Sequence, residues 1–464
     1  MATSRLEVNL SAIDRNYGII RGLLESPATA ATADQPAPPA ARPARPAVCG
    51  VIKQNAYGLG SARMARKLSA LGCELLAVYC LDEARELAEV PITTPILCLM
   101  PVRGIDRGDP VYRLTSRGRL HLTLHDAAQT QELIAAAVRL GVQIPVHVQL
   151  DTGMSRGGCL EDEARKVVEL VLGSPRLQLA GLMTHFSSPA GDDTYTREQA
   201  KAFKTWIESV KGPIAAARAT SAWVHAANTA GVLRSRALHA SMVRVGQGFY
   251  GYGFESFTDP LAVEFGAAGK ALQPAVRWLS RIVHIHEIPK GAPVGYGRTY
   301  KAPRPTRVGL VPVGYADGYP TSLSSNPQSN QATARVQLTG HMYDRPRTQG
   351  GPASAPETRE RPSWAGVIGR VSMDQITIDL TGLPESLARV GAEVELIGSD
   401  PQGPNGLPML ARAANSITHE LLCRVCPKIE RVYVSSAGSE SGAAGGAAPA
   451  DSFRAVTRPS MLVA

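Results

Sequence analysis

The sequence predicts an α/β protein, with an N-terminal (β/α)8 TIM-like barrel followed by a mainly antiparallel β domain. Short apolar runs alternate with helical patterns between Ala47 and Tyr250, which is typical of βαβ units and a parallel sheet. After Gly251 the apolar runs continue while helical patterns become scarce. This change favours a second domain built from antiparallel strands joined by turns.

The first region contains the eight apolar runs that a closed barrel requires. In chain order the expected strands are Ala47–Ile52, Leu75–Val78, Pro95–Leu99, Leu120–Leu124, Pro145–Leu150, Leu177–Met183, Ala222–His225 and Met242–Val245. Helical patterns lie between most of them, at Ala62–Leu71, Asp82–Glu89, Asp126–Leu140, Glu161–Leu172 and Thr196–Lys211. We therefore expect the barrel to span residues 12–255.

Residues 256–434 form the predicted β domain. Its expected strands are Val276–Ile285, Arg307–Pro312, Ala334–Leu338, Val371–Leu380 and Ala392–Ile397. The alternating run Arg5 to Leu10 could add a strand to either domain, and we assign residues 1–11 to the β domain.

Three segments have compositions that cannot build a core. Residues 26–46 are almost wholly Ala, Pro, Thr and Arg, and residues 343–362 are rich in Pro, Arg, Gly and Ser. We expect the first to be an insertion in the barrel and the second a long surface loop. The Gly/Ala/Ser-rich tail, residues 435–464, is predicted to be disordered.

Composition excludes several functional classes. The 464 residues are 44% hydrophobic, but no stretch reaches the apolar length of a transmembrane helix. Met1 to Asn9 lack the apolar core of a secretory signal, so we expect a cytoplasmic protein. The net charge of +9 comes from scattered arginines, which gives nucleic-acid binding little support. The seven cysteines suggest no disulfide framework, and Cys423 and Cys426 have no partners at zinc spacing.

Lys53 ends the first apolar run and precedes a polar turn that contains Gly58. Burying an ammonium without a partner is costly, so this lysine is not a core residue. Two interpretations remain for it alone: a surface cation, or an amine held in a pocket for covalent chemistry.

Polar residues follow five of the eight expected strands, at the face where barrels gather function. They are Lys53, Asp151 to Arg156, His185, Asn228 with Thr229, and Arg244 with Gly246. Each alone could be a solvated loop residue, but jointly they favour a site. Gly246-Gln247-Gly248 offers backbone N–H groups where barrels commonly bind phosphate. A lysine beside a phosphate cradle suggests pyridoxal 5'-phosphate held as a Schiff base.

The motifs resemble those of the alanine racemase family, the fold-type III pyridoxal-phosphate enzymes. The similarity covers nearly the whole chain outside the three biased segments. Its motifs are Val51-Ile52-Lys53-Gln54-Asn55-Ala56-Tyr57-Gly58, Asp151-Thr152-Gly153-Met154-Ser155-Arg156, Thr184-His185-Phe186, Asn228-Thr229, Arg244-Val245-Gly246, Val294-Gly295-Tyr296-Gly297-Arg298-Thr299-Tyr300, Gly314-Tyr315-Ala316-Asp317-Gly318-Tyr319 and Gly369-Arg370-Val371-Ser372-Met373-Asp374-Gln375.

The resemblance implies a pair of catalytic bases. Lys53 would bind the cofactor and then exchange the substrate α-proton on one face, while Tyr296 of the partner subunit does so on the other. Because Tyr296 acts across an interface in this family, the resemblance also implies a head-to-tail homodimer. The phenol must then lie where cations favour its ionised form.

The resemblance assigns the remaining site residues as well. Arg244 would face the pyridine nitrogen and be held by His185, and Arg156 would meet the phenolic oxygen of the cofactor. The other implied cofactor-binding residues are Tyr57, Asn228, Thr229, Gly246, Gln247 and His419. The implied substrate-binding residues are Arg156, Met373 and Tyr315, and no metal is expected.

Several positions depart from the family pattern. Gln149 stands where many members carry a carbamylated lysine that braces the arginine at position 156, and an anion such as chloride could replace it. Thr229 replaces a serine and Ser372 a cysteine, both with little expected effect. His419 replaces a tyrosine and could either be a tolerated change or widen the pocket.

Three functions from two classes follow. The first is an alanine racemase that supplies D-alanine for peptidoglycan, and the second a racemase of similar mechanism with broader substrate choice. The third is a pyridoxal-phosphate carrier without turnover, which Tyr296 argues against because a carrier needs no second base. A metal-dependent aldolase on the same fold is a further alternative, but the sequence of the β domain shows no His/Cys cluster that could bind the metal.

Overall fold

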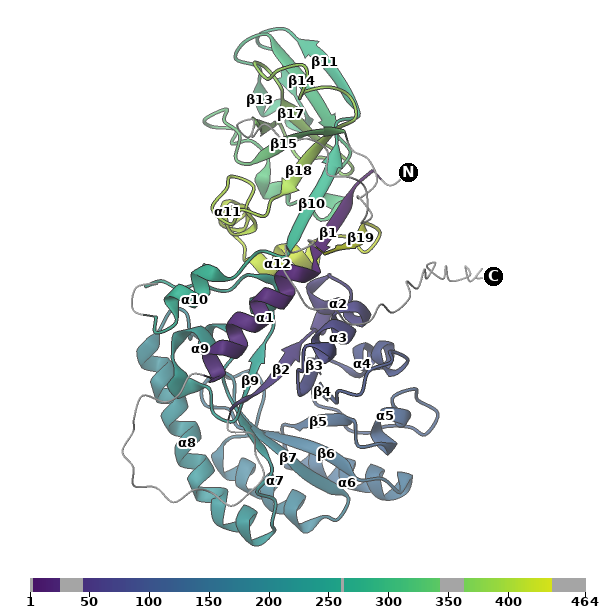
Figure 1. Ribbon diagram of the computed structural model, residues 1–464, viewed down its shortest axis with the longest axis vertical. Helices are drawn as coiled ribbons and strands as arrows, with labels where there is room; N and C mark the ends of the chain where they lie inside the picture. Colours follow the sequence, from purple (N-terminus) through teal and green to yellow (C-terminus); the bar gives the residue numbers. More distant parts are fainter. Residues whose placement is uncertain (1–2, 26–44, 260–262, 343–362, 436–464) are drawn as a thin grey trace, which may run out of the picture.

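The structure is a computed structural model that describes residues 3–25, 45–259, 263–342 and 363–435. Its described residues form a closed barrel and a nine-stranded sheet, placed end to end along the long axis (Figure 1). The predicted fold class is therefore confirmed. The predicted loop 343–362 and the tail from 436 lie outside the described residues, as does the insertion 26–46 except for its last two positions.

The barrel consists of parallel strands that pair in chain order and close between the first and the last. They are β2 (Ala47–Val51), β3 (Leu75–Val78), β4 (Ile96–Cys98), β5 (Leu120–Leu124), β6 (Ile144–Gln149), β7 (Leu177–Met183), β8 (Trp223–His225) and β9 (Met242–Val245). All eight coincide with the apolar runs in the sequence. Parallel pairing brings the carboxyl ends of all eight strands to one face.

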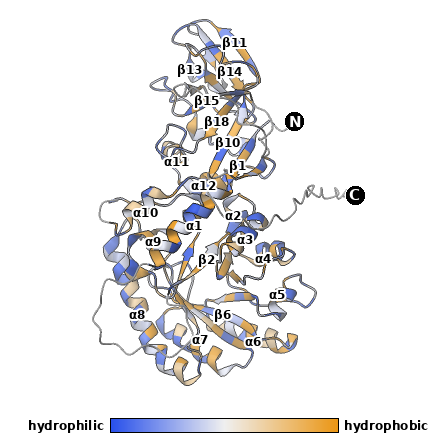
Figure 2. Cartoon of the chain, viewed as in Figure 1, coloured by the Kyte–Doolittle hydropathy of each residue, from blue (hydrophilic) through white to orange (hydrophobic). Residues whose placement is uncertain are grey.

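Helices surround the barrel (Figure 1) and most of them bury one face, while every residue of α9 is buried. They are α1 (Leu10–Glu25), α3 (Ser61–Ala70), α4 (Leu81–Ala88), α5 (Tyr112–Ser116), α6 (Ala127–Leu140), α7 (Glu161–Gly173), α8 (Asp193–Ala216), α9 (Thr229–Arg234) and α10 (Gly266–Ala271). In α7 the buried residues are Ala164, Val167, Val168 and Val171, a spacing of three and four. The outer helices accordingly mix hydrophobic and hydrophilic residues (Figure 2).

The interior of the barrel has an apolar half and a polar half. Small and branched residues of β2, β3 and β4 form a separate buried cluster with Met242. On β5, β6, β8 and β9 the buried polar side chains instead include His121, His147, His225 and Arg244. Buried polar groups of this kind need partners inside the barrel.

The second domain is a nine-stranded sheet in the order β11-β14-β17-β16-β15-β18-β10-β1-β19. The strands are β1 (Arg5–Asn9), β10 (Val276–Arg281), β11 (His284–Ile288), β14 (Thr306–Val311), β15 (Arg335–Met342), β16 (Ser363–Ile368), β17 (Ile376–Asp379), β18 (Ala392–Ile397) and β19 (Glu430–Val434). Every pairing is antiparallel except that of β1 with β19. The sheet also carries the short pair β12 (Pro293–Val294) and β13 (Tyr300–Lys301), and helices α11 (Leu407–Ala413) and α12 (Thr418–Arg424).

Three predicted strands of this domain are wrong in extent. The run Ala334–Leu338 continues to Met342 in β15. The run Val276–Ile285 divides into β10 and β11, because the chain exchanges its partner β18 for β14 near Ile282. The run Val371–Leu380 is a strand only over Ile376–Asp379, since Ser372 N–H donates to the carbonyl of Gln375 and closes a turn. The predicted domain boundary near residue 255 stays a prediction.

Candidate active site

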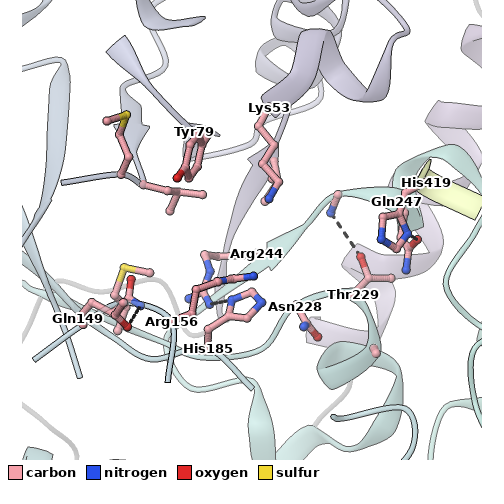
Figure 3. Close-up of a pocket in the computed structure, with 18 of the residues that line it drawn as sticks. Lys53, Tyr79, Gln149, Arg156, His185, Asn228, Thr229, Arg244, Gln247 and His419 are labelled. Carbon is pink, nitrogen blue, oxygen red and sulfur yellow. Dashed lines mark hydrogen bonds between the residues drawn. The ribbon is translucent and has the colours of Figure 1, made fainter. Parts of the chain in front are cut away.

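A cavity of about 620 Å³ opens at the carboxyl ends of the barrel strands. Lys53 points into it from above Arg156, and His419 closes one end from the second domain (Figure 3). Every barrel residue predicted for the site lines this cavity, together with His419. The set is Lys53, Tyr57, Arg156, His185, Asn228, Thr229, Arg244, Gly246, Gln247 and His419.

Lys53 lies two residues beyond the last residue of β2 and is only partly exposed. Burial lowers the pKa of its amine from the ordinary value, and the nearby charge of Arg156 lowers it further. Both effects disfavour the ammonium form. Lys53 therefore releases its proton more readily than a surface lysine, which suits an amine nucleophile or base.

The segment after Lys53 is a left-handed turn, α2 (Lys53–Tyr57). Its last four residues, Gln54 to Tyr57, have φ between 51° and 59° although none is glycine. Such a conformation costs about 1–2 kcal/mol per residue and needs outside support. Part of that support is Glu83, whose carboxylate accepts hydrogen bonds from the backbone N–H groups of Gln54 and Tyr79.

Further support comes from β19 in the second domain. Arg431 Nε donates to the carbonyl of Gly58 over 2.9 Å, and Tyr433 Oη donates to the carbonyl of Leu59 over 2.8 Å. Gly60, with φ of 99°, leaves room for this phenol: a Cβ there would lie 2.1 Å from Tyr433 Oη. The second domain thus fixes the position of the lysine turn.

Arg244 lies on the floor of the cavity with its guanidinium held by groups of the barrel. It donates to the carbonyls of Thr184, His225 and Ala226 over 2.7–3.0 Å. It also meets His225 Nδ1 at 2.9 Å and His185 Nδ1 at 3.0 Å. Burial lowers its pKa to about 10, so the guanidinium stays charged at neutral pH.

His185 is held as a neutral ring. Burial lowers its pKa to about 3, and the charges of Arg244, Arg156 and Lys53 act in the same direction. Because a guanidinium only donates, His185 Nδ1 must accept from Arg244 and its proton must sit on Nε2. The predicted pairing of His185 with Arg244 is therefore present in the structure (Figure 3).

The opposite end of the cavity is a set of hydrogen-bond donors. Thr229 Oγ1 accepts hydrogen bonds from the backbone N–H groups of Gly246 and Gly248, at 3.3 and 3.4 Å, which leaves its hydroxyl proton to donate to a ligand. Burial raises the pKa of Tyr57 well above its ordinary value, so its phenol remains a donor. His419 Nδ1 lies 3.1 Å from Gln247 Oε1. These groups match an anion such as phosphate.

Asn228 uses part of its side chain elsewhere. Its Oδ1 accepts from the N–H of Gly231 over 3.0 Å and caps α9. The side chain thereby fixes the start of the helix that presents Thr229 to the cavity.

Arg156 has no hydrogen bond or ion pair to any residue within the described ranges, and its side chain is exposed to the cavity. Gln149 Nε2 donates to the carbonyl of Gly157 over 2.8 Å instead of bracing Arg156. The loop that carries Arg156 is shaped by Asp151, whose carboxylate accepts from three successive backbone N–H groups. The guanidinium is thus available for an anionic ligand.

Tyr296, Tyr315 and Met373 do not line the cavity of Lys53. They surround a separate hollow of about 1120 Å³ on the second domain and are 71%, 46% and 53% exposed. Tyr296 shortly precedes β13, a strand in the half of the second domain that lies away from the barrel (Figure 1). Within one chain, the two groups of predicted site residues remain apart.

The family models match most of the chain. "Alanine racemase, N-terminal domain" covers residues 40–253, and "Alanine racemase, C-terminal domain" covers residues 275–343 and 355–433. The chain belongs to the alanine racemase family. Members of the family are isomerases that act on amino acids, so the chain is an enzyme of this class.

Individual relatives agree with the family assignment. Alanine racemase from Staphylococcus carnosus is 30% identical over 92% of this chain and 94% of its own length. The solved alanine racemase of Clostridium difficile 630 is 26% identical, with a TM-score of 0.73 over 94% of this chain and 97% of that one. An alanine racemase structure from Bartonella henselae has covalently bound pyridoxal phosphate; at 22% identity and a TM-score of 0.70 over 94% of this chain, it shows the shared fold.

Three residues in or next to this cavity were not singled out in the sequence analysis. Tyr79 follows β3 and faces Lys53 across the cavity (Figure 3), so the rule that strand ends carry function would have found it. His225 ends β8 and meets Arg244, but in the sequence it is only the last residue of an apolar run. His125 follows β5 and also lines the cavity.

Neither a metal site nor a membrane span emerges from the part of the chain that the structure describes. Its His, Cys, Asp and Glu residues nowhere gather in groups of three or more that could hold a metal ion. None of its helices combines the length and the hydropathy that crossing a membrane requires.

Proposed function

We propose that this enzyme interconverts L-alanine and D-alanine with two bases and so supplies D-alanine for peptidoglycan synthesis in the cytoplasm. The observation that carries the proposal is the barrel cavity. It combines a lysine of lowered pKa, a fixed guanidinium and a donor-lined anion pocket. These are the parts that covalent capture of an anionic carbonyl cofactor needs.

The cofactor is pyridoxal 5'-phosphate, and the cavity fits it. A Cβ at Gly246 would lie 2.1 Å from Tyr57 Oη, so glycine lets this phenol sit against the backbone of the loop at the end assigned to the phosphate. Thr229, Gln247, Asn228 and His419 surround the same end, Lys53 would hold the carbonyl end, and Arg244 the ring nitrogen. When bound, the cofactor withdraws electrons from the substrate α-carbon and so acidifies its proton.

Lys53 Nζ moves the α-proton on one face of the substrate. Its lowered pKa makes the neutral amine accessible near neutral pH, which a general base requires. Tyr296 Oη of the partner subunit moves the proton on the opposite face. Racemisation needs both, since one base takes the proton and the other returns a proton from behind.

Arg244 controls how strongly charge is withdrawn from the substrate. A guanidinium retains its protons, so it donates to a ring nitrogen without protonating it. His185 keeps the plane of Arg244 fixed through the 3.0 Å contact. Arg156 and the backbone N–H of Met373 would orient the substrate carboxylate, and Tyr315 would line the entrance.

The enzyme would act as a homodimer with shared sites. Tyr296, Tyr315 and Met373 lie exposed on the second domain, far along the chain from the cavity that they would serve. A head-to-tail pair would place the second domain of each subunit over the cavity of the other.

Mixing two inactive variants tests the whole proposal. Lys53→Ala and Tyr296→Phe should each abolish racemisation of alanine when measured alone. Unfolding and refolding an equal mixture should restore about one quarter of the wild-type activity, because half of the dimers then contain one intact site. Tyr300→Phe, which alters a buried neighbour of Tyr296, is the matched control and should remain active. No recovery in the mixture would contradict shared sites, and an active Tyr296→Phe variant would contradict the second base.

A second candidate is a racemase of broader substrate choice, favoured by His419. Its imidazole is engaged with Gln247 and closes one end of the cavity, where a larger residue would occupy more of the space. Rates on serine or lysine equal to or above the rate on alanine would establish this alternative. A clear preference for alanine would exclude it.

A further inference from the structure

A continuous line of hydrogen bonds runs from Arg244 through the polar half of the barrel. Arg244 Nη1 meets His225 Nδ1 at 2.9 Å, His225 Nε2 meets His147 Nδ1 at 2.8 Å, and His147 Nε2 meets His121 Nδ1 at 2.9 Å. With His185 on the other guanidinium nitrogen, the network contains four histidines. Of these residues, only His185 and Arg244 have a role in the proposed reaction.

The space for this line is built into the barrel. Gly181 on β7 lies against His147 Nδ1, the atom that meets His225. A Cβ at position 181 would be 2.2 Å from this nitrogen. The indole of Trp223 stacks on both His121 and His147, with ring centroids 6.3 Å apart and planes within 27°. Trp223 on β8 therefore packs on both rings, and Gly181 on the adjacent strand β7 leaves room for His147.

The charge of Arg244 sets the direction of every bond in the line. A guanidinium has only donors, so His225 Nδ1 must accept and a neutral His225 carries its proton on Nε2. That proton is donated to His147 Nδ1, which places the proton of His147 on Nε2. By the same step His121 Nδ1 accepts, and the proton of His121 also sits on Nε2.

These proton positions require neutral imidazole rings, and the surroundings of the three histidines favour the neutral form. His121, His147 and His225 are each no more than 7% exposed, and burial lowers the pKa of all three. The charge of Arg244 further lowers the pKa of His147 and His225. A proton added to His225 would also turn Nδ1 into a donor facing a donor.

We propose that His147 and His121 are positioning residues for Arg244, which lock His225 in the Nε2–H form and so fix the guanidinium on the cavity floor. This role rests on the proposed function for its catalytic consequence, but the proton positions do not depend on it. If His121 could not accept, the buried N–H of His147 would lose its partner, which favours the other tautomer. That tautomer would donate to His225 Nε2 and push a proton toward Arg244.

The test compares wild type with His121→Leu and His121→Asn. Leucine has no acceptor, whereas asparagine Oδ1 occupies about the place of the imidazole Nδ1 and can restore the bond. Protein labelled with 15N-histidine gives the proton position on each ring from its nitrogen chemical shifts. We expect Nε2–H at every histidine of the network in wild type and in His121→Asn between pH 6 and 8, and a mixed state at His147 and His225 in His121→Leu.

Kinetics supply the second measurement. The loss of one buried hydrogen bond corresponds to about a five- to tenfold fall in kcat for His121→Leu, with KM nearly unchanged and recovery to within about twofold in His121→Asn. Wild-type tautomers alone can overturn the proposal: a charged ring, or Nδ1–H on His147 or His225, would do so even if a variant failed to fold. An unchanged kcat in a folded His121→Leu variant would also overturn it. Absence of racemisation in wild type would instead reject the proposed function.

Discussion

The contact between Gly60 and Tyr433 gives a quantitative prediction for the turn that carries Lys53. In Gly60→Ala the new Cβ would lie 2.1 Å from Tyr433 Oη, far inside van der Waals contact, while the backbone would keep φ near 99°. Left-handed backbone strain costs about 1–2 kcal/mol for alanine. Forcing the phenol aside adds about 1–3 kcal/mol of overpacking. We expect Gly60→Ala to lower the free energy of unfolding by about 2–5 kcal/mol.

Removing the hydroxyl separates these two costs. Tyr433→Phe alone loses the hydrogen bond to the carbonyl of Leu59, worth about 1 kcal/mol. In the double variant the nearest remaining atom is Cζ of residue 433 at 3.4 Å, so only backbone strain and the lost bond remain. The double variant should therefore be at least about 1 kcal/mol more stable than the sum of the single changes predicts.

Urea unfolding followed by fluorescence of the four tryptophans measures all three variants. Gly118→Ala is the matched control, because Gly118 has φ of 64° but no atom within 4 Å of the added Cβ. It should show backbone strain without overpacking. Free energies that add to within about 0.5 kcal/mol in the double variant would refute the steric account.

Two further predictions concern histidines. His185 and His121 have folded pKa values of about 3 and about 4, below the unfolded value near 6.5, so the unfolded chain binds their protons first. These two rings should leave the free energy of unfolding unchanged above pH 6.5. Below pH 6.5 each ring should lower it by up to about 1.4 kcal/mol per pH unit, which is followed as a fall in the melting temperature. A melting temperature that stays flat from pH 6.5 to 4.5 would contradict this. His419→Tyr should raise the ratio of kcat/KM for alanine over serine about tenfold, by filling one end of the cavity; an unchanged ratio would show that His419 does not select the substrate.

The periodicity of the first 250 residues predicted the barrel and its strand ends, because eight buried parallel strands must read as apolar runs. Strand order alone therefore assigns Lys53, Arg156, His185 and Arg244 to one face of the barrel. The same kind of pattern failed for the second domain, where the break between β10 and β11 depends on which strand lies alongside. A local sequence pattern does not show where a strand changes the neighbouring strand with which it pairs.

Two features of the site depend on tertiary contacts that the sequence does not display. Propensity argues against four consecutive non-glycine residues in the left-handed region, and contacts from Glu83, Arg431 and Tyr433 support the turn after Lys53. His121 and His147 interrupt apolar strands without any motif. Their hydrogen bonds to Arg244 through His225 can be recognised only in the closed barrel.

The place of β1 between β10 and β19 has a consequence for the order of folding. The first strand to be synthesised pairs with one strand that follows the whole barrel and with another that ends at Val434. Until then, Leu6 and Val8, which are fully buried in the finished sheet, have no partners. Pairings of such sequence separation form late and leave apolar strands exposed on the way. Newly made chains should therefore depend on chaperones until the ribosome has released β19.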